Sequence, residues 1–250
     1  MAPSKYLIRA LSKPIKVDES LWEKWYAEEH TPDAVNAGIG DRGAFFRAHN
    51  EFSLQTKTPS GSGETKLHGA QLSHFNELPG DKTFCAVYQT KFENYTETEE
   101  IKKTMTTSEM FGGKEFFPLA EWDVRVYELI QDYNPDNLPD SAPPFVLHVQ
   151  NEPADDADYH DFYENEHLGL LHKVPGYRRS QRYKLIHNII GAPDDTPRFL
   201  VIHEWEHLDA LDGPELRAAD LSPNVHRVFG TAKAVNVRGF RSVYNKGYSK

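Results

Sequence analysis

The order of apolar and polar positions along the chain occurs twice. Strand-like runs begin at Tyr6, Phe45, Phe84 and Asp123 in the first half, and at Phe145, Ser180, Phe199 and Asn236 in the second. After the first and third run of each half, apolar residues recur every three or four positions, which indicates helices. The later helical stretches cover residues 97–109 and 214–229. The predicted order is therefore β-α-β-β-α-β in each half.

The first predicted helix of each half carries the clearest sign of a repeat. The segment Trp25-Tyr-Ala-Glu-Glu-His30 recurs 137 residues later as Phe162-Tyr-Glu-Asn-Glu-His167. We therefore divide the chain into an N-terminal repeat at residues 1–130 and a C-terminal repeat at residues 145–250. The prolines and acidic residues of 131–144 predict a linker between them. The Gly- and Ser-bearing stretch 55–69 predicts a surface insertion.

This order of elements is that of a ferredoxin-like unit, in which helices cover one face of an antiparallel sheet. The other face of such a sheet is apolar and needs a cover of its own. Because two units lie in one chain, the simplest closure packs the two sheets together within the monomer. The predicted fold class is thus α+β, with tandem ferredoxin-like repeats forming an intramolecular, pseudo-twofold α/β barrel.

Composition and charge narrow the class of function. The 250 residues carry a formal net charge of −10, whereas binding to nucleic acid needs a concentrated basic face. The sequence has neither a signal-peptide pattern nor eighteen uninterrupted apolar residues, so we expect a cytoplasmic protein without a membrane partner. The single cysteine, Cys85, lies in an apolar run and is expected in the core.

Candidate chemistry lies on the first helix of each half. A rotation of about 100° per residue places carboxylate side chains on an aromatic face with a histidine at its edge. In the second half this face holds Tyr159, Phe162, Tyr163, Glu166 and Leu170, with His167 at the edge. In the first half it holds Trp22, Trp25, Tyr26, Glu29 and Asp33, with His30 at the edge. Such a pair can tune an imidazole for proton transfer, or its members can simply bond neighbouring loops.

Two strand histidines, His148 and His203, form a second candidate group. Their counterparts in the first half are Arg9 and Tyr88. If these side chains share a cavity with His167, they supply proton donors and acceptors around an aromatic pocket. The substrate-binding residues predicted on this basis are Arg9, Trp22, Tyr26, Tyr88, His148, Phe162 and Tyr183. The alternative is that the polar members are satisfied side chains at the rim of the barrel.

Metal and nucleotide sites find little support. The segment His203-Glu-Trp-Glu-His207 has carboxylates between histidines, but it lies on a predicted strand and lacks the helical spacing of the HExxH zinc motif. The sequence has no P-loop, no GxGxxG after a strand and no GxSxG turn. We therefore expect neither a metal nor a nucleotide cofactor.

Three segments of the second half together resemble the EthD-like branch of the dimeric α/β-barrel superfamily. They are Phe162-Tyr-x-x-Glu-His167, Val174-Pro-Gly-Tyr177 and Phe199-Leu-Val-Ile-His-Glu-Trp205. The first half keeps the helix motif, but Gly38-Ile-Gly40 replaces the usual Pro-Gly turn. The resemblance implies that tandem repeats build here the barrel that two subunits build elsewhere, as in fused fungal members.

The resemblance also implies a class of chemistry. Relatives include cofactor-free polyketide cyclases, dehydratases and decarboxylases, in which a histidine, often near a tyrosine, acts as acid or base on aromatic or polyketide-derived substrates. By position, that histidine falls on His167 and, in the other repeat, on His30. We hypothesise that His167, assisted by Tyr163 or His203, removes a proton next to a carbonyl, and that Arg9 or a neighbouring donor stabilises the enolate.

Other interpretations stay open at this point. The chain can be a haem-binding or quinol-oxidising barrel enzyme, or a non-catalytic small-molecule-binding or stress protein. The substrate, the reaction, the repeat that holds the active pocket, and the choice between a monomer with an internal pseudo-dimer and a homodimer are not determined by the sequence.

Overall fold

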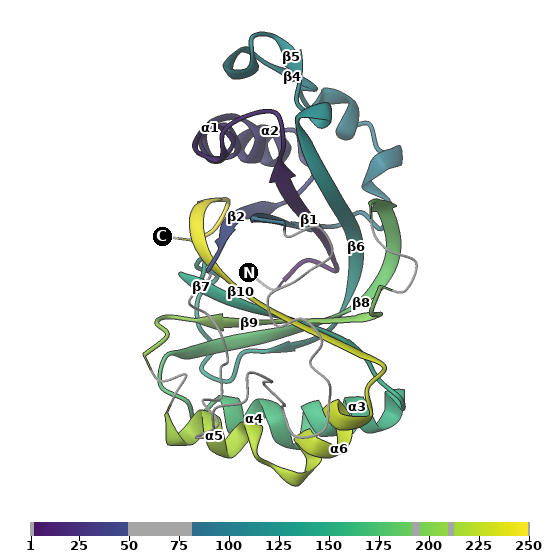
Figure 1. The fold of residues 1–250 in the computed structure, drawn as a ribbon, viewed down its shortest axis with the longest axis vertical. Helices are drawn as coiled ribbons and strands as arrows, with labels where there is room; N and C mark the ends of the chain where they lie inside the picture. The colour runs from purple at the N-terminus through teal and green to yellow at the C-terminus, as the bar shows by residue number, and fades with distance from the viewer. Residues whose placement is uncertain (1–2, 50–81, 192–195, 210–212, 250) are drawn as a thin grey trace.

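The protein is built around one closed antiparallel β-barrel (Figure 1). The computed structural model describes residues 3–49, 82–191, 196–209 and 213–249. Eight strands follow one another around the barrel in the order β1-β3-β2-β10-β7-β9-β8-β6. Their bounds are β1 Tyr6–Pro14, β2 Arg42–Ala48, β3 Phe84–Thr90, β6 Ala120–Tyr133, β7 Phe145–Glu152, β8 Tyr177–Ile190, β9 Phe199–Trp205 and β10 Ala234–Lys246.

The two halves of the chain each contribute four adjacent strands in equivalent order. The first half gives β6-β1-β3-β2, and the second gives β10-β7-β9-β8. The last strand of each half therefore pairs with the second strand of the other, as β6 with β8 and β10 with β2. These pairings close the barrel, because they leave no free edge on either half-sheet. The predicted tandem ferredoxin-like barrel is confirmed.

Helices cover the barrel at two opposite ends of the view in Figure 1. One layer contains α1 Glu19–Trp25 and α2 Thr31–Asn36, and the other contains α3 Asp156–Phe162, α4 Leu168–Leu171, α5 Pro214–Asp220 and α6 Pro223–Thr231. A π-helical turn joins α1 to α2 at η1 Tyr26–His30, and another joins α3 to α4 at η6 Tyr163–His167. Both turns fall on the repeated sequence motif, so the two copies share their local conformation.

The prediction of a second helix in the first half, at residues 97–109, is wrong. The segment forms short 3₁₀ turns at η2 Tyr95–Glu97, η3 Ile101–Lys103 and η4 Glu109–Phe111, and a small hairpin of β4 Thr107–Ser108 with β5 Lys114–Glu115. Another 3₁₀ turn, η5 Phe117–Leu119, precedes β6. The hydroxyls of Thr98 and Thr104 bond nearby backbone carbonyls, and such local bonds compete with a continuous helix.

The helix predicted at residues 214–229 is present as two shorter helices. The Ser222 side chain accepts a hydrogen bond from the Val225 backbone N–H, and Pro223 occupies the first turn of α6. A proline has no N–H to continue the preceding helix, so α5 ends at Asp220 and a new helix starts.

Alternation along the strands divides the core into three layers. Leu7 and Leu11 of β1 face the barrel interior, while Ile8 and Ala10 face the first helical layer. Strands β7 and β9 alternate in the same way between the interior and the second helical layer. Each strand is therefore buried on both faces, which explains why its pattern includes long apolar runs.

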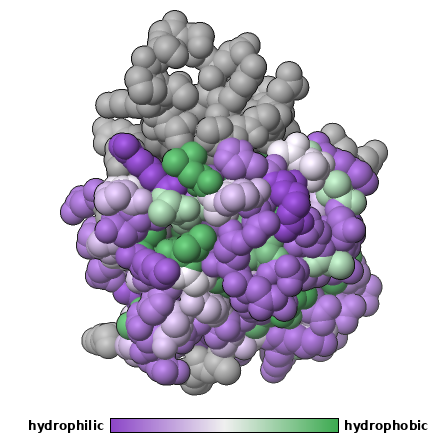
Figure 2. Space-filling model, turned by 90° about the horizontal axis from the view of Figure 1, so that it is seen from below, coloured by the Kyte–Doolittle hydropathy of each residue, from purple (hydrophilic) through white to green (hydrophobic). Residues whose placement is uncertain are grey.

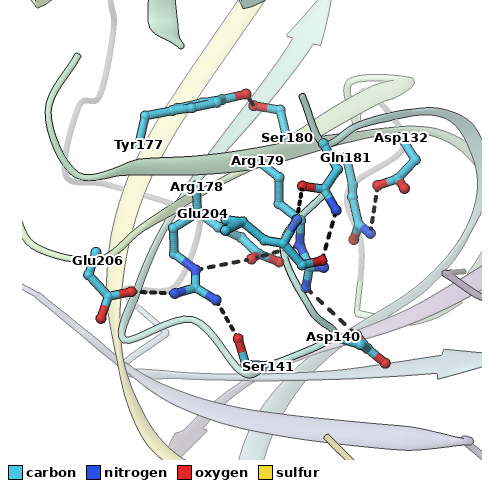
Figure 3. Close-up of polar contacts among 12 residues, drawn as sticks. Asp132, Asp140, Ser141, Tyr177, Arg178, Arg179, Ser180, Gln181, Glu204 and Glu206 are labelled. Carbon is cyan, nitrogen blue, oxygen red and sulfur yellow. Dashed lines mark hydrogen bonds and ion pairs between the residues drawn. The ribbon is translucent and has the colours of Figure 1, made fainter. Parts of the chain in front are cut away.

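One end of the barrel interior holds a network of buried ion pairs (Figure 3). Arg179 donates to Glu204 at 2.8 Å, and Arg42 forms a salt bridge with Asp140. Asp140 comes from the segment 131–144, which is expected from its prolines and acidic residues to be a linker. In the structure β6 continues to Tyr133, and Asp140 is buried, so this segment is fixed to the barrel by charge.

Two remaining expectations concern the surface. The insertion predicted at residues 55–69 lies outside the described residues. Across the described ranges, no helix has the length and apolar character needed to cross a membrane.

Replacing Asp140 tests the role of the interior ion pairs. In Asp140→Asn the buried Arg42 loses its anionic partner, which is expected to lower the free energy of unfolding by about 3–5 kcal/mol. Asp136 lies in the same segment and pairs with half-buried His172, but its side chain is 52% exposed. Asp136→Asn should therefore lower the free energy of unfolding by less than about 1 kcal/mol. Urea unfolding measures both. Equal losses would show that the buried pair does not hold the segment in place.

Candidate functional site

A cavity lies between the barrel and the helices of the second half. Its volume is about 610 Å³, including open solvent at its mouth. The walls are mainly aliphatic and aromatic, with a few polar groups. The lining residues are Leu147, Val149, Tyr163, His167, Leu171, His203, Trp205, Leu216, Asp220, Val225, Phe229, Val235 and Val237. A concave, largely apolar site with a few polar groups is typical of small-molecule binding.

The π-helical turn η6 positions two of the polar groups. The backbone N–H of Leu168 bonds the carbonyl of Tyr163, five residues earlier, so the turn contains one more residue than an α-helical turn. Tyr163 and His167 are both buried and both line the cavity. The His167 ring stacks on Phe162, with centroids 4.8 Å apart. The wide turn thus brings His167 from the expected helix edge to the interior.

The same turn moves Glu166 away from the predicted position. Glu166 does not line the cavity, and it accepts a hydrogen bond from the side-chain amide of Asn224 on α6. The expectation that Glu166 faces inward beside His167 is therefore wrong. It assumed 100° per residue, and a π-helical turn rotates each residue by less.

A chain of two hydroxyl groups, from Tyr177 through Ser180, fixes the position of the His203 ring. Its Nδ1 lies 2.6 Å from the Ser180 Oγ, which lies 2.6 Å from the Tyr177 hydroxyl. Figure 3 shows the Tyr177–Ser180 contact next to the interior network. Because Nδ1 is occupied, the Nε2 of His203 is the ring nitrogen left to interact with a ligand. The His203 and His167 rings lie 6.3 Å apart, centroid to centroid.

Tyr163 is fixed by a buried cation. The Arg182 guanidinium lies over its ring, 4.6 Å from the centroid, and over the ring of Tyr159 at 5.1 Å. Arg182 reaches this position from β8, where it also donates to Gln131 and contacts His160. Cation–π contacts of this kind stabilise the rings where they are desolvated, so Tyr163 has a defined position in the wall.

Burial makes both cavity histidines neutral. It lowers the pKa of His167 and that of His203 to about 3. Burial also raises the pKa of the Tyr163 hydroxyl well above 10. At neutral pH the cavity therefore presents two uncharged imidazoles and a protonated phenol.

Asp220 is a functional candidate that sequence reasoning missed. It lines the cavity at the end of α5, and burial raises the pKa of its carboxyl to about 7. No hydrogen bond within the described residues joins it to either imidazole. Leu216 is buried four residues earlier on the same helical face, so helical periodicity alone could have placed Asp220 toward the core.

Three predicted site residues lie inside the barrel instead. Arg9 and His148 face the interior, where the Arg9 Nε donates to the His148 Nδ1 at 3.3 Å. Tyr183 belongs to the same interior layer. His148 and His203 lie on adjacent strands but on opposite faces of the sheet, since Leu147 and not His148 pairs with His203. The structure therefore does not bring these three residues into the cavity with His167.

The equivalent layer of the first half is packed with aromatic rings. His30 is half-buried between Trp25 and Phe116, at 4.5 and 5.0 Å between centroids, and burial lowers its pKa to about 4. The other predicted residues of this half, Trp22, Tyr26 and Tyr88, are buried in the same aromatic layer. None of them lines the described cavity. Phe162 supports His167 without lining the cavity itself.

The segment His203–His207, at the end of β9, does not gather metal ligands. Glu204 faces the barrel interior, Glu206 pairs with Arg178, and His207 is close to Asp209. Within the described ranges no group of three or more His, Cys, Asp or Glu side chains could hold a metal ion.

Haem is a poor match for the cavity wall. His167 or His203 could act as an axial ligand, but the propionates of haem need cationic or hydrogen-bonding partners. The only charged side chain among the described lining residues is Asp220, which would repel them. Haem propionates would therefore find hydrogen-bonding groups, but no arginine or lysine, among the described lining residues.

The outer surface over this layer offers little apolar area. Figure 2 shows the molecule from the side of the second helical layer, where the surface is mostly hydrophilic and apolar side chains appear in small patches. Among the large apolar residues described, Leu221 between α5 and α6 is the most exposed, at 53%. The apolar walls of the site thus lie mainly inside the cavity.

Acid sensitivity tests the neutral state of the histidines. Because burial lowers the folded-state pKa of His167 from 6.5 to about 3, the unfolded chain binds more protons between these values. Stability should be full above about pH 6.5 and fall toward pH 3. From pH 7 to 4.5, His167→Gln should lose roughly 1–3 kcal/mol less than the unsubstituted protein in urea unfolding. His187→Gln, whose imidazole is 40% exposed, should behave like the unsubstituted protein. Matching losses in both variants would contradict a buried, neutral His167.

Comparisons with known proteins support the architecture. No protein-family model matches the chain. "Core atranone cluster (CAC) protein 1" of Stachybotrys chlorohalonatus is 23% identical over 240 residues, covering 88% of this chain and 90% of that protein.

Solved structures with similar folds are more distant in sequence. A putative monooxygenase from Fusobacterium nucleatum matches with a TM-score of 0.54 at 7% identity, covering 97% of this chain and 94% of the other. An anthrone oxidase-like protein matches with a TM-score of 0.53 at 14% identity, covering 97% and 93%. A haem complex of a DypB variant from Rhodococcus jostii matches with a TM-score of 0.52 at 11% identity, covering 97% and 94%. The chain thus has the fold of the dimeric α+β barrel proteins.

Proposed function

We propose that the protein is a cofactor-independent acid–base enzyme of secondary metabolism. Its substrate would be an aromatic or polyketide-derived small molecule that binds in the cavity of the second half. The observation that carries the proposal is a carboxyl group with a pKa of about 7, Asp220, in the same apolar cavity as two neutral imidazoles. The similarity to an atranone-cluster protein supports the metabolic setting, and the sequence motifs support an EthD-like origin.

Asp220 is the group best suited to move a proton at neutral pH. A general base works best when its pKa lies near the working pH. The lowered pKa of His167, about 3, makes its imidazole a much weaker base than an ordinary histidine. We therefore assign proton removal next to a substrate carbonyl to Asp220, and we revise the role of His167 from base to hydrogen-bond donor.

The imidazoles and the phenol would stabilise the negative charge that forms on the substrate. Removal of a proton next to a carbonyl places charge on the carbonyl oxygen as an enolate. A neutral imidazole can donate its N–H to that oxygen, and burial strengthens the bond. His203 is suited to this role because its Nδ1 is held by Ser180. His167 and Tyr163 supply further donors, and Arg9 is excluded because it faces the barrel interior.

The enolate can lead to more than one product. Attack of the enolate on a second carbonyl closes a ring, and expulsion of a β-hydroxide, which takes up a proton, releases water. Alternatively, loss of carbon dioxide from a β-keto acid forms the same enolate, which then takes up a proton. The names of the fold neighbours, which include a monooxygenase and an anthrone oxidase-like protein, favour a second candidate in which molecular oxygen oxidises the enolate, one oxygen atom entering the product and the other leaving as water. Cyclisation leaves the mass unchanged, whereas loss of water, loss of carbon dioxide and oxidation each change it by a different amount, which makes the candidates separable.

The proposal is tested by comparing small molecules from the host with the gene intact, deleted or restored. We expect deletion to accumulate a precursor that the restored protein converts and that Asp220→Asn does not. A precursor isomeric with the product indicates cyclisation, an excess of water or carbon dioxide indicates dehydration or decarboxylation, and a product richer in oxygen indicates oxidation. His30→Gln is the matched control, because His30 lies in the other layer, and it should restore conversion. Full conversion by Asp220→Asn would contradict the assignment.

The pH dependence of turnover gives a sharper test of Asp220. Because the carboxylate must be ionised to accept a proton, kcat should rise with pH through about 7 and then level off. Asp220→Asn should lower kcat by about 10²–10⁴-fold and abolish this inflection. Asp209→Asn removes an exposed carboxylate near α5 in sequence and should leave the profile unchanged. A profile retained in Asp220→Asn would assign the titration to another group.

A further inference from the structure

A second polar cluster lies inside the barrel, separate from the cavity. It is centred on Arg9 of β1 and His148 of β7, which occupy equivalent positions in the two repeats and are each 1% exposed. The Arg9 Nε donates to the His148 Nδ1 at 3.3 Å. This contact joins the two halves at the centre of the molecule.

The cluster contains more positive than negative charge among the described residues. Arg9 lies directly opposite Arg125 on β6, and His148 lies directly opposite Arg238 on β10. For Arg9 and Arg125 together, the carboxylate among the described contacts is Asp123, which forms two hydrogen bonds with Arg125. Like charges placed opposite each other on neighbouring strands destabilise a sheet, and burial increases this cost.

Three N–H groups of this cluster are unused, and the hydroxyl of Tyr127 is the neighbouring group that could accept from Arg125. The Nη1 atoms of Arg9 and Arg125 are buried without a hydrogen-bond partner in the described part of the chain, and so is the Nε2 of His148. The Nδ1 of His148 accepts from Arg9, so a neutral imidazole carries its proton on Nε2. Arg9 and Arg238 help burial to hold the pKa of His148 well below its ordinary value, which keeps the ring neutral. Three N–H groups from three strands thus remain to be satisfied.

The ion-pair network around Arg179 shows that this barrel can balance buried arginines with carboxylates. There Arg179 bonds Glu204 (Figure 3), and Arg42 bonds Asp140. Each of these arginines has its own carboxylate. Among the described residues Arg9 has no hydrogen bond or ion pair with a carboxylate, and its Nε donates instead to the neutral ring of His148.

We propose that the Arg9, Arg125 and His148 cluster is a binding site for a small anion within the barrel. Guanidinium and imidazole N–H groups together suit a halide, an inorganic oxyanion or a carboxylate. The anion would lie between the repeats and offset the repulsion between Arg9 and Arg125. This site goes beyond the proposed reaction, because none of its residues lines the cavity of the second half.

Thermal unfolding with different sodium salts at constant ionic strength tests the proposal. Gluconate is the bulky reference, and chloride, bromide, formate and phosphate are the probes. A probe that binds only the folded protein should raise Tm by about 5 °C when its concentration is a hundredfold above its Kd. Arg9→Met should weaken this response at least about tenfold in Kd. Lys5→Met removes an exposed positive charge beside β1 and should retain the full response.

The outcomes distinguish the sources of the anion. A response to halides alone indicates an inorganic ion, whereas a preference for formate indicates the carboxylate of an organic ligand. Anomalous diffraction from crystals of the unsubstituted protein in bromide provides a readout that does not depend on the folding of Arg9→Met, and bromide should appear beside Arg9, Arg125 and His148. Bromide confined to the surface, together with equal responses to all salts, would overturn the proposal.

Discussion

The structure depends on one constraint, which is that each half-sheet has two faces that must be buried and cannot be stable alone. Helices cover one face, and the half-sheet of the other repeat covers the second. The pairings β6–β8 and β2–β10 satisfy this requirement and remove the sheet edges at the same time. Because the interior of the closed barrel is filled by side chains of both repeats, space for a ligand of the proposed size has to be found outside it, between a half-sheet and its helices.

The two helical layers use that space differently. In the first half, the rings of Trp22, Trp25, Phe111 and Trp122 pack against one another and fill the region beneath the helix motif. In the second half, smaller side chains such as Val149, Val235 and Val237 leave a cavity under an equivalent π-helical turn. The repeats therefore share a backbone and have diverged in side-chain volume. We infer that one layer serves stability and the other serves binding.

Much of the fold could be predicted because it follows from local patterns. Alternation on the strands and the repeated helix motif gave the order of elements, and the position of His203 on the helix-facing side follows from a period of two. Other features required information that local periodicity lacks. His167 is buried and Glu166 is not because the turn that carries them is π-helical. Local hydrogen bonds of Thr98 and Thr104 favour 3₁₀ turns over the predicted helix. The contact between Arg9 and His148 forms only when the two half-sheets close the barrel. Asp220 is the exception, since its helical face could have revealed it.

The central claim is that the cavity beneath η6 is the active site. The measurement that tests it most directly is a crystal structure of the protein with the precursor that accumulates in the deletion strain, bound to a variant too slow to convert it. The account predicts electron density between the β7, β9 and β10 face and α4–α6, with the reactive carbonyl oxygen within hydrogen-bond distance of His203 or His167 and the acidic carbon next to Asp220. Density in the first helical layer, or inside the barrel, would contradict the account.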